Sequence, residues 1–230
     1  MAELDYLTLL GAELDRFAGC LDGDLAAPVP DCGDWTLYDL ANHLGAGNLW
    51  AAVAVTEKHG RHSPPPAPRA PDALAAWFAG SCATLLTTLA ADPATEAWTF
   101  FPPHTVGFWR RRRTLETLVH RWEAAHALGR PAPLDPALAA DGVAEVFDTM
   151  APRQVKRGRA AAPANAVRFT TADSGDSWVY GPGEPVAQAR GTAADLLLML
   201  WNRLPATDPA ISWTGDRAAA AAVLDGPLVP

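Results

Sequence analysis

Apolar residues recur at helical spacing along four segments of the first half of the chain. Intervals of three and four residues place these side chains on one face, so each segment is predicted to be an amphipathic α-helix. The segments are residues 3–19, 36–58, 71–91 and 114–129. Thr36 and Asp39 have the spacing of a capping box at the start of the second helix, and Gly129 ends the fourth. Four helices of comparable length predict a four-helix bundle.

The pattern changes in the second half of the chain. Residues 135–150 are predicted to form a connecting helix, and residues 151–164 a basic loop rich in Pro and Ala. Short β-type runs then alternate with turn residues and with apolar stretches of helical spacing. The predicted strands are 166–171, 177–180, 185–189 and 210–213, and the predicted helices are 193–203 and 217–224. The expected fold class is α+β, with a bundle in residues 1–150 and a small α+β domain in residues 151–230.

The fourth helix carries the main candidate for chemistry. Glu116 and His120 are four residues apart, so they share one face of the helix, with Glu123 one turn further along. Such a pair can bind one metal ion without bending the backbone, although the alternative is a solvated pair on the helix surface. Two protein ligands are too few for a zinc site. His43, at the edge of the apolar stripe of the second helix, is the candidate third ligand.

Several other residues in the first half of the chain are interpreted mainly as structural. His126 falls on the apolar stripe of the fourth helix and is expected to be a satisfied core histidine. The aromatic segment 98–109 is expected to be an irregular connector, and the run Arg110 to Arg113 a solvated helix start. The alternative is that one or two of these arginines attract an anionic substrate. Gly45 and Gly47 weaken the second helix by about 1 kcal/mol each relative to alanine. We therefore expect them to allow close approach by another helix or a ligand.

Composition narrows the functional classes. The chain has 230 residues, 49% of them hydrophobic, and a formal net charge of −8, which argues against nucleic acid as a partner. The chain shows no evident apolar run of membrane-spanning length and no signal-like leader, so no membrane partner is expected. Cys20, Cys32 and Cys82 have no C-x-x-C spacing, which indicates structural thiols in a reducing cytoplasm.

Several segments together carry a family resemblance. They read D-W-T-L-Y-D-L-A-N-H-L-G at 34–45, E-T-L-V-H-R-W-E-A-A at 116–125 and D-P-A-L-A-A-D-G-V-A-E-V at 135–146, with G-T-A-A-D-L-L-L-M-L-W-N-R and T-G-D-R nearer the C-terminus. In these segments the chain resembles the mycothiol-dependent maleylpyruvate isomerase family, part of the wider group of DinB-like metalloenzymes. The resemblance spans essentially the whole chain and implies a DinB-like bundle followed by an α+β domain.

The resemblance implies a divalent metal, usually zinc, held by a histidine of the second helix and an E-x-x-x-H pair of the fourth. The matching positions are His43, Glu116 and His120. Glu123 stands where the family usually has Asp, so the way this acid orients His120 from outside the coordination sphere is expected to be altered. Three protein ligands leave zinc one open position, which is typical of a catalytic site.

The resemblance further implies that the thiol of mycothiol occupies the open position. A free cysteine thiol has a pKa of about 8.5, and coordination to a divalent cation removes its proton. The thiolate can then attack a small electrophile, either in cis-trans isomerisation of maleylpyruvate or in S-transfer. Arg203 and Arg217 are candidate clamps for a dicarboxylate, and Trp50 is a candidate pocket wall. The protein is expected to be a monomer or a small homo-oligomer.

Two alternatives stay open at this stage. The first is a thiol-independent metal hydrolase on the same bundle, with water in the open position. The second is a non-catalytic binding protein that has kept the scaffold.

Overall fold

The structure is a computed structural model that describes residues 4–30 and 32–230. The chain divides into two compact units, Met1–Pro133 and Leu134–Pro230. This division lies earlier than the boundary expected after residue 150. The reason is that helix α5 (Pro136–Glu145), predicted as a connector, packs on α7 (Ala193–Leu200) and so belongs to the second unit.

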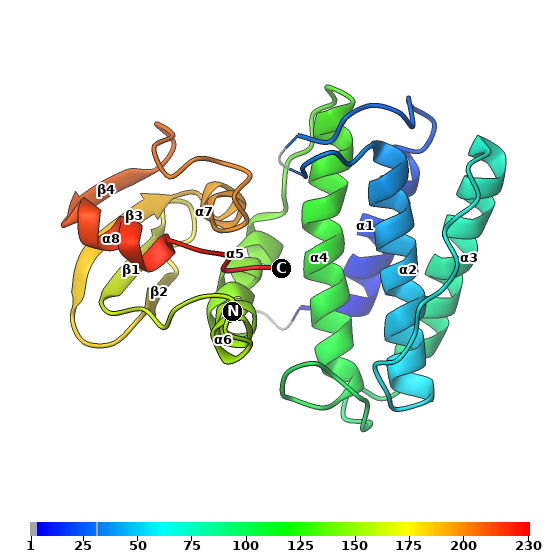
Figure 1. Ribbon diagram of the computed structural model, residues 1–230, viewed down its shortest axis with the longest axis horizontal. Helices are drawn as coiled ribbons and strands as arrows, with labels where there is room; N and C mark the ends of the chain where they lie inside the picture. Colours follow the sequence, from blue (N-terminus) through cyan, green and yellow to red (C-terminus); the bar gives the residue numbers. More distant parts are fainter. Residues whose placement is uncertain (1–3, 31) are drawn as a thin grey trace. The chain divides into compact units, whose positions relative to one another are not determined.

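The described part of the first unit contains four long helices (Figure 1). They are α1 (Tyr6–Ala18), α2 (Leu37–Thr56), α3 (Pro71–Leu89) and α4 (Val106–Ala127). Helix α4 packs on both α1 and α2, and α3 packs on α2 and α1. Their apolar faces meet in one core that includes Leu10, Phe17, Leu40, Leu44, Phe78 and Trp109. Each such side chain contributes about 1.5–3 kcal/mol when it is fully buried.

Helix α2 begins where the capping pattern predicted. The Thr36 hydroxyl oxygen accepts from the backbone N–H of Asp39, and the Asp39 carboxylate accepts from the backbone N–H of Thr36. A cap of this kind contributes about 1 kcal/mol. It also sets the phase of the helix, which decides the face on which His43 lies, because side chains repeat every 3.6 residues.

Helix α4 is longer than predicted, and its extra length changes the environment of the arginine run. It begins at Val106 rather than Thr114, so the connector is shorter than expected and Arg110 to Arg113 lie inside the helix. Arg112 and Arg113 are buried. The expectation of a solvated helix start was therefore wrong for these two arginines, and Arg113 contacts Leu44 of α2.

Helix α3 has the length and hydropathy of a membrane span, although no such span was expected from the sequence. It is 19 residues long with a mean hydropathy of 1.2, and 28% of its apolar window is buried. Its large apolar residues Leu74, Phe78, Leu85 and Leu89 are in the core of the first unit. The rest of its hydropathy comes mainly from small residues, many of them alanine. The core packing favours a globular interpretation, and the absence of a membrane partner stays a prediction.

The second unit contains a four-stranded mixed sheet in the order β2-β1-β3-β4. The strands are β1 (Ala166–Thr171), β2 (Ser177–Tyr180), β3 (Pro185–Gly191) and β4 (Ser212–Gly215). The central pair β1–β3 is parallel, and the two outer pairs are antiparallel. Helices α7 and α8 (Arg217–Leu224) contact the two central strands. The α+β fold class is thus confirmed.

One segment of the second unit departs from the sequence prediction. A π-helical turn, η1 (Val146–Met150), follows α5 and leads directly into α6 (Ala151–Lys156). The predicted loop at 151–164 is therefore helical in its first turn and a half. Pro152, the second residue of α6, closely follows the π-helical turn, and its missing N–H removes one backbone hydrogen bond from this continuous helical run.

Candidate metal centre

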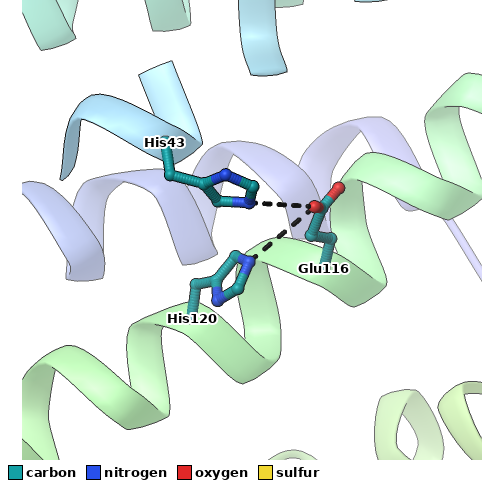
Figure 2. Close-up of side chains that lie close together, drawn as sticks. All are labelled: His43, Glu116 and His120. Carbon is teal, nitrogen blue, oxygen red and sulfur yellow. Dashed lines mark ion pairs between the residues drawn. The ribbon is translucent and has the colours of Figure 1, made fainter. Parts of the chain in front are cut away.

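Three side chains from two helices converge in the first unit. His43 projects from α2, and Glu116 and His120 project from α4, with both imidazoles directed toward one oxygen of Glu116 (Figure 2). Nε2 of His43 lies 3.5 Å from Oε1 of Glu116, and Nε2 of His120 lies 3.7 Å from the same oxygen. One ligand atom from each residue lies within 4.8 Å of the others. The structure therefore brings together the three residues that the sequence indicated.

The donor set fits a divalent metal. A zinc ion with ligands at 2.0–2.1 Å in a tetrahedral arrangement requires ligand atoms about 3.4 Å apart. The separations of 3.5 and 3.7 Å from Glu116 Oε1 are close to this value. Two imidazoles and one carboxylate are also the ligand set of one class of catalytic zinc sites, in which a fourth position stays open.

Glu123 accounts for the orientation of His120. Nδ1 of His120 lies 2.6 Å from Oε2 of Glu123, and both side chains are buried. A hydrogen on Nδ1 directed at this carboxylate leaves Nε2 as the lone-pair donor toward the site. Burial favours the neutral imidazole, but the charges of Glu123 and Glu116 outweigh it and raise the pKa of His120 to about 9 in the metal-free protein. The glutamate thus reaches His120 despite its additional methylene.

The other oxygen of Glu116 is held by arginines that the sequence analysis had placed in solvent. Nη1 of Arg113 lies 2.6 Å from Oε2 of Glu116, and Nη2 of Arg112 lies 3.5 Å from it. Burial alone raises the pKa of a carboxyl group, but these two guanidinium groups hold the pKa of Glu116 well below its ordinary value. Glu116 is therefore anionic at neutral pH, as a metal ligand must be.

Arg113 also ties α4 to α2 at the level of the site. Its Nη2 donates to the backbone carbonyl of Leu44 at 3.0 Å and to Oδ1 of Asn48 at 2.7 Å. Leu44 is the residue next to His43, so this contact sets the height of the His43 backbone relative to Glu116. A glycine at position 47 makes room for it, because a Cβ there would lie 2.7 Å from Nη1 of Arg113. The expectation that Gly47 permits a close approach is confirmed.

The three ligands differ in their exposure to solvent. The side chain of His43 is 42% exposed, that of Glu116 18% and that of His120 6%. Trp35, which precedes α2 and is itself exposed, packs against His43 with ring centroids 5.0 Å apart. The site is therefore accessible on the side of His43, and Trp35 lies beside that approach.

Four residues around the three side chains were not predicted from the sequence as part of the site: Arg112, Arg113, Asn48 and Trp35. One signal could have identified Arg113 and Arg112: they precede Glu116 by three and four residues, so they share its helix face. Asn48 and Trp35 had no local signal, because what defines them is contact with α4 and with the His43 ring.

Of the three predicted substrate residues, Trp50 alone belongs to the same unit as His43, Glu116 and His120. Trp50 donates its indole N–H to the Gly60 carbonyl at 2.9 Å and packs against Trp98, Phe100 and Trp109, and its role as a pocket wall stays a prediction. Arg203 and Arg217 lie in the second unit, and their roles stay predictions.

His126 is not a core residue, because it lies at the exposed end of α4. Its ring stacks on Trp122 with centroids 4.8 Å apart. Cys20, Cys32 and Cys82 are not joined in a disulfide.

Comparisons with known proteins agree with this architecture. The domain described as Mycothiol maleylpyruvate isomerase N-terminal domain matches residues 7–125, and the MDMPI C-terminal domain matches residues 137–222. Two Mycobacterium tuberculosis proteins are similar in sequence: Uncharacterized protein MT0763 (strain CDC 1551 / Oshkosh) and Uncharacterized protein Rv0738 (strain ATCC 25618 / H37Rv). Each is 31% identical over 149 residues, covering 60% of this chain and 76% of the relative.

Solved structures show the same fold. The crystal structure of the mycothiol-dependent maleylpyruvate isomerase matches with a TM-score of 0.68 at 16% identity, over 92% of this chain and 93% of that chain. A histidine-to-alanine mutant of that isomerase matches with the same TM-score at 15% identity and the same coverage. Since the two domain matches together span most of both units, the chain belongs to the mycothiol maleylpyruvate isomerase family.

Proposed function

We propose that this protein is a divalent-metal enzyme that uses mycothiol, with the metal held by His43, Glu116 and His120. The observation that carries the proposal is the convergence of both Nε2 atoms on one oxygen of Glu116, in a chain whose family takes its name from a mycothiol-using isomerase. The ligand set favours zinc among the divalent metals. The four packed helices are consistent with the DinB-like bundle of that family.

The protein residues would hold the metal and orient the side chains that bind it, and the metal would lower the pKa of a bound thiol. A divalent cation bound at this site lowers the pKa of a coordinated thiol, so that the thiolate is available at neutral pH. Glu123 holds the proton on Nδ1 of His120, which keeps Nε2 available as a ligand. Glu116 stays ionised because Arg112 and Arg113 lie beside it. The exposed edge of His43 leaves a path by which thiol and electrophile reach the site.

Isomerisation and S-transfer both begin with activation of the thiol. We therefore propose this class of reaction and not one of the two reactions. Both would use the activated thiol that the bound metal would supply, together with an electrophilic substrate. If the substrate is a dicarboxylate such as maleylpyruvate, Arg203 and Arg217 are the proposed clamps, because guanidinium groups bind carboxylates in a bidentate manner. A cytoplasmic location is proposed from the three free thiols.

The test is an assay of zinc-loaded protein with mycothiol against maleylpyruvate and a panel of electrophiles, followed by mass spectrometry for isomerised product and thiol conjugates. We expect turnover that requires both metal and thiol and that is lost in His120→Ala. His126→Ala is the matched control, since this exposed histidine lies on the same helix. Turnover that persists without thiol would support the hydrolase instead, and purified protein that retains no metal would support a non-catalytic binding protein.

A further inference from the structure

The buried guanidinium group of Arg113 joins three groups at the metal centre. It contacts Oε2 of Glu116, the carbonyl of Leu44 and Oδ1 of Asn48 at 2.6, 3.0 and 2.7 Å. Asn48 is fully buried and is linked in turn to Ser81 of α3 through its amide at 3.4 Å. The guanidinium group is therefore fixed by α2 and α4 together rather than by its own helix alone.

The burial of the Arg113–Glu116 ion pair is not explained by stability alone. A buried ion pair gives little net stabilisation, because desolvation of the two charges offsets their attraction. The same charge can however orient its partner. With Oε2 held by Arg113 and lying 3.5 Å from Arg112, only Oε1 of Glu116 is directed at the two imidazoles.

Resting on the metal site proposed above, we propose that Arg113 is a positioning residue that restricts Glu116 to metal binding through Oε1 alone, and that Gly47 is the position that permits it. A carboxylate free at both oxygens can bind a metal through two atoms, which uses the position otherwise left for thiol or substrate. Arg113 prevents this by occupying Oε2. Gly47 is required because any larger side chain would displace the guanidinium group from its three partners.

The sharpest variant is Gly47→Ala, because it moves Arg113 without removing any charge or hydrogen-bonding group. The added Cβ would lie 2.7 Å from Nη1 and 3.3 Å from Cζ of Arg113. The obstacle is the end of a flexible side chain, so the fold can accommodate it while the guanidinium group shifts. Alanine also favours the helix over glycine, so Gly47→Ala is expected to remain folded. Gly80→Ala in α3 is the matched control, since a Cβ there has open space around it.

A second pair of variants separates orientation from charge. Arg113→Lys keeps the positive charge, but one ammonium group cannot reproduce the planar fork that joins Glu116, Leu44 and Asn48. Arg121→Lys is the matched control. Arg121 is also a buried arginine of α4, and it pairs with a buried glutamate, Glu13, at 2.8 Å. Among the described residues, its side-chain hydrogen bonds go to Glu13 and to the Pro133 carbonyl and not to His43, Glu116 or His120.

The readouts are the visible absorption spectrum of protein loaded with Co²⁺ in place of zinc, and the zinc dissociation constant from competition with a chromophoric chelator. Cobalt absorbs strongly when four-coordinate and weakly when its coordination number rises, so the spectrum reports how Glu116 binds. We expect Gly47→Ala and Arg113→Lys to lose cobalt absorption intensity and to weaken zinc binding by about 10- to 100-fold. Both controls are expected to match the parent protein.

The outcomes distinguish this inference from the proposed function. If the parent protein binds cobalt with a four-coordinate spectrum, and both Gly47→Ala and Arg113→Lys give the same spectrum and affinity, Arg113 does not position Glu116. If Arg113→Lys alone retains the parent spectrum, the charge and not the orientation is what matters, and the inference is again wrong. If the parent protein itself binds neither metal, the proposed metal centre is at fault, and the inference fails with it.

Discussion

Nδ1 of His120 and Oε2 of Glu123 lie 2.6 Å apart in the interior of the first unit, one helical turn from each other on α4. This pair decides which nitrogen of His120 is offered to the metal centre, because the hydrogen on Nδ1 is held by the carboxylate. Glutamate at this position therefore lies within hydrogen-bond distance of the imidazole, and its proposed role is to orient the ring of His120.

Replacing that carboxylate by an amide is expected to weaken metal binding. Glu123→Gln keeps the size and one acceptor oxygen but loses the negative charge, so the imidazole becomes a poorer ligand. Loss of such a partner typically reduces metal affinity by 10- to 100-fold. The measurement is a zinc dissociation constant by chelator competition, with Glu96→Gln, an exposed glutamate paired with Lys58, as control. An unchanged constant would show that Glu123 has no orienting role.

The metal-free protein is expected to lose stability as the pH rises. The pKa of His120 in the folded protein is about 9, above its ordinary value of 6.5, so protonation stabilises the folded state. That stabilisation is fully present below pH 6.5 and disappears as the pH rises through 9. Urea unfolding in the presence of a chelator between pH 6 and 10 measures it, with an upper limit of about 3 kcal/mol. In Glu123→Gln the decline should be much smaller, and a parent protein with no decline would contradict the assignment.

Removing the charge of Glu116 alone is expected to be more damaging than removing both partners of its ion pair. Glu116→Gln leaves Arg113 buried without its counter-charge, and such a change costs about 3–5 kcal/mol. Glu116→Gln combined with Arg113→Met removes the buried charge as well, so part of the loss should be recovered. Urea unfolding of the two single variants and the double variant, in the presence of chelator, gives the coupling energy. Additive effects would mean that the two side chains do not interact.

Two glycines of neighbouring helices are expected to respond to alanine in opposite directions. A Cβ at Gly45 would lie 2.4 Å from the Trp77 ring, whereas one at Gly80 meets nothing within 4 Å. Gly45→Ala should therefore destabilise the protein by about 1–3 kcal/mol through overpacking. Gly80→Ala should stabilise it by up to about 1 kcal/mol through helix propensity. Thermal unfolding midpoints test both, and equal shifts of the same sign would refute this account of the α2–α3 contact.

Cys82 is expected to resist alkylation in the folded protein. Burial raises the pKa of its thiol from an ordinary value of 9.0 to about 11. At pH 8 its thiolate fraction is therefore about 100-fold lower than that of an unperturbed thiol. Mass spectrometry after iodoacetamide treatment measures its modification, with urea-unfolded protein as the positive control. Rapid labelling of folded protein at pH 8 would show that the thiol is neither shielded nor perturbed.

The local pattern of residues was sufficient for most of the secondary structure and for the ligand pair on α4. The start of α2 followed from Thr36 and Asp39, because a capping box uses only contacts within four residues. Glu116 and His120 could be paired for the same reason, since their spacing places them on one face of a helix. His43 as the candidate third ligand required only that its helix pack against α4, and α2 and α4 are in contact.

The environment of the site was decided by tertiary structure. A run of four arginines has the composition of a solvated surface, and nothing within the run reveals that α4 begins before it and that Arg112 and Arg113 are buried. The burial of Arg113, its contact with Leu44 and the need for Gly47 arise from a second helix that lies far away in the sequence. Local spacing determines which side chains share a face, but only the packing of α2 on α4 determines what that face meets. The chain itself therefore specified the ligands, and the fold specified the charges that hold them.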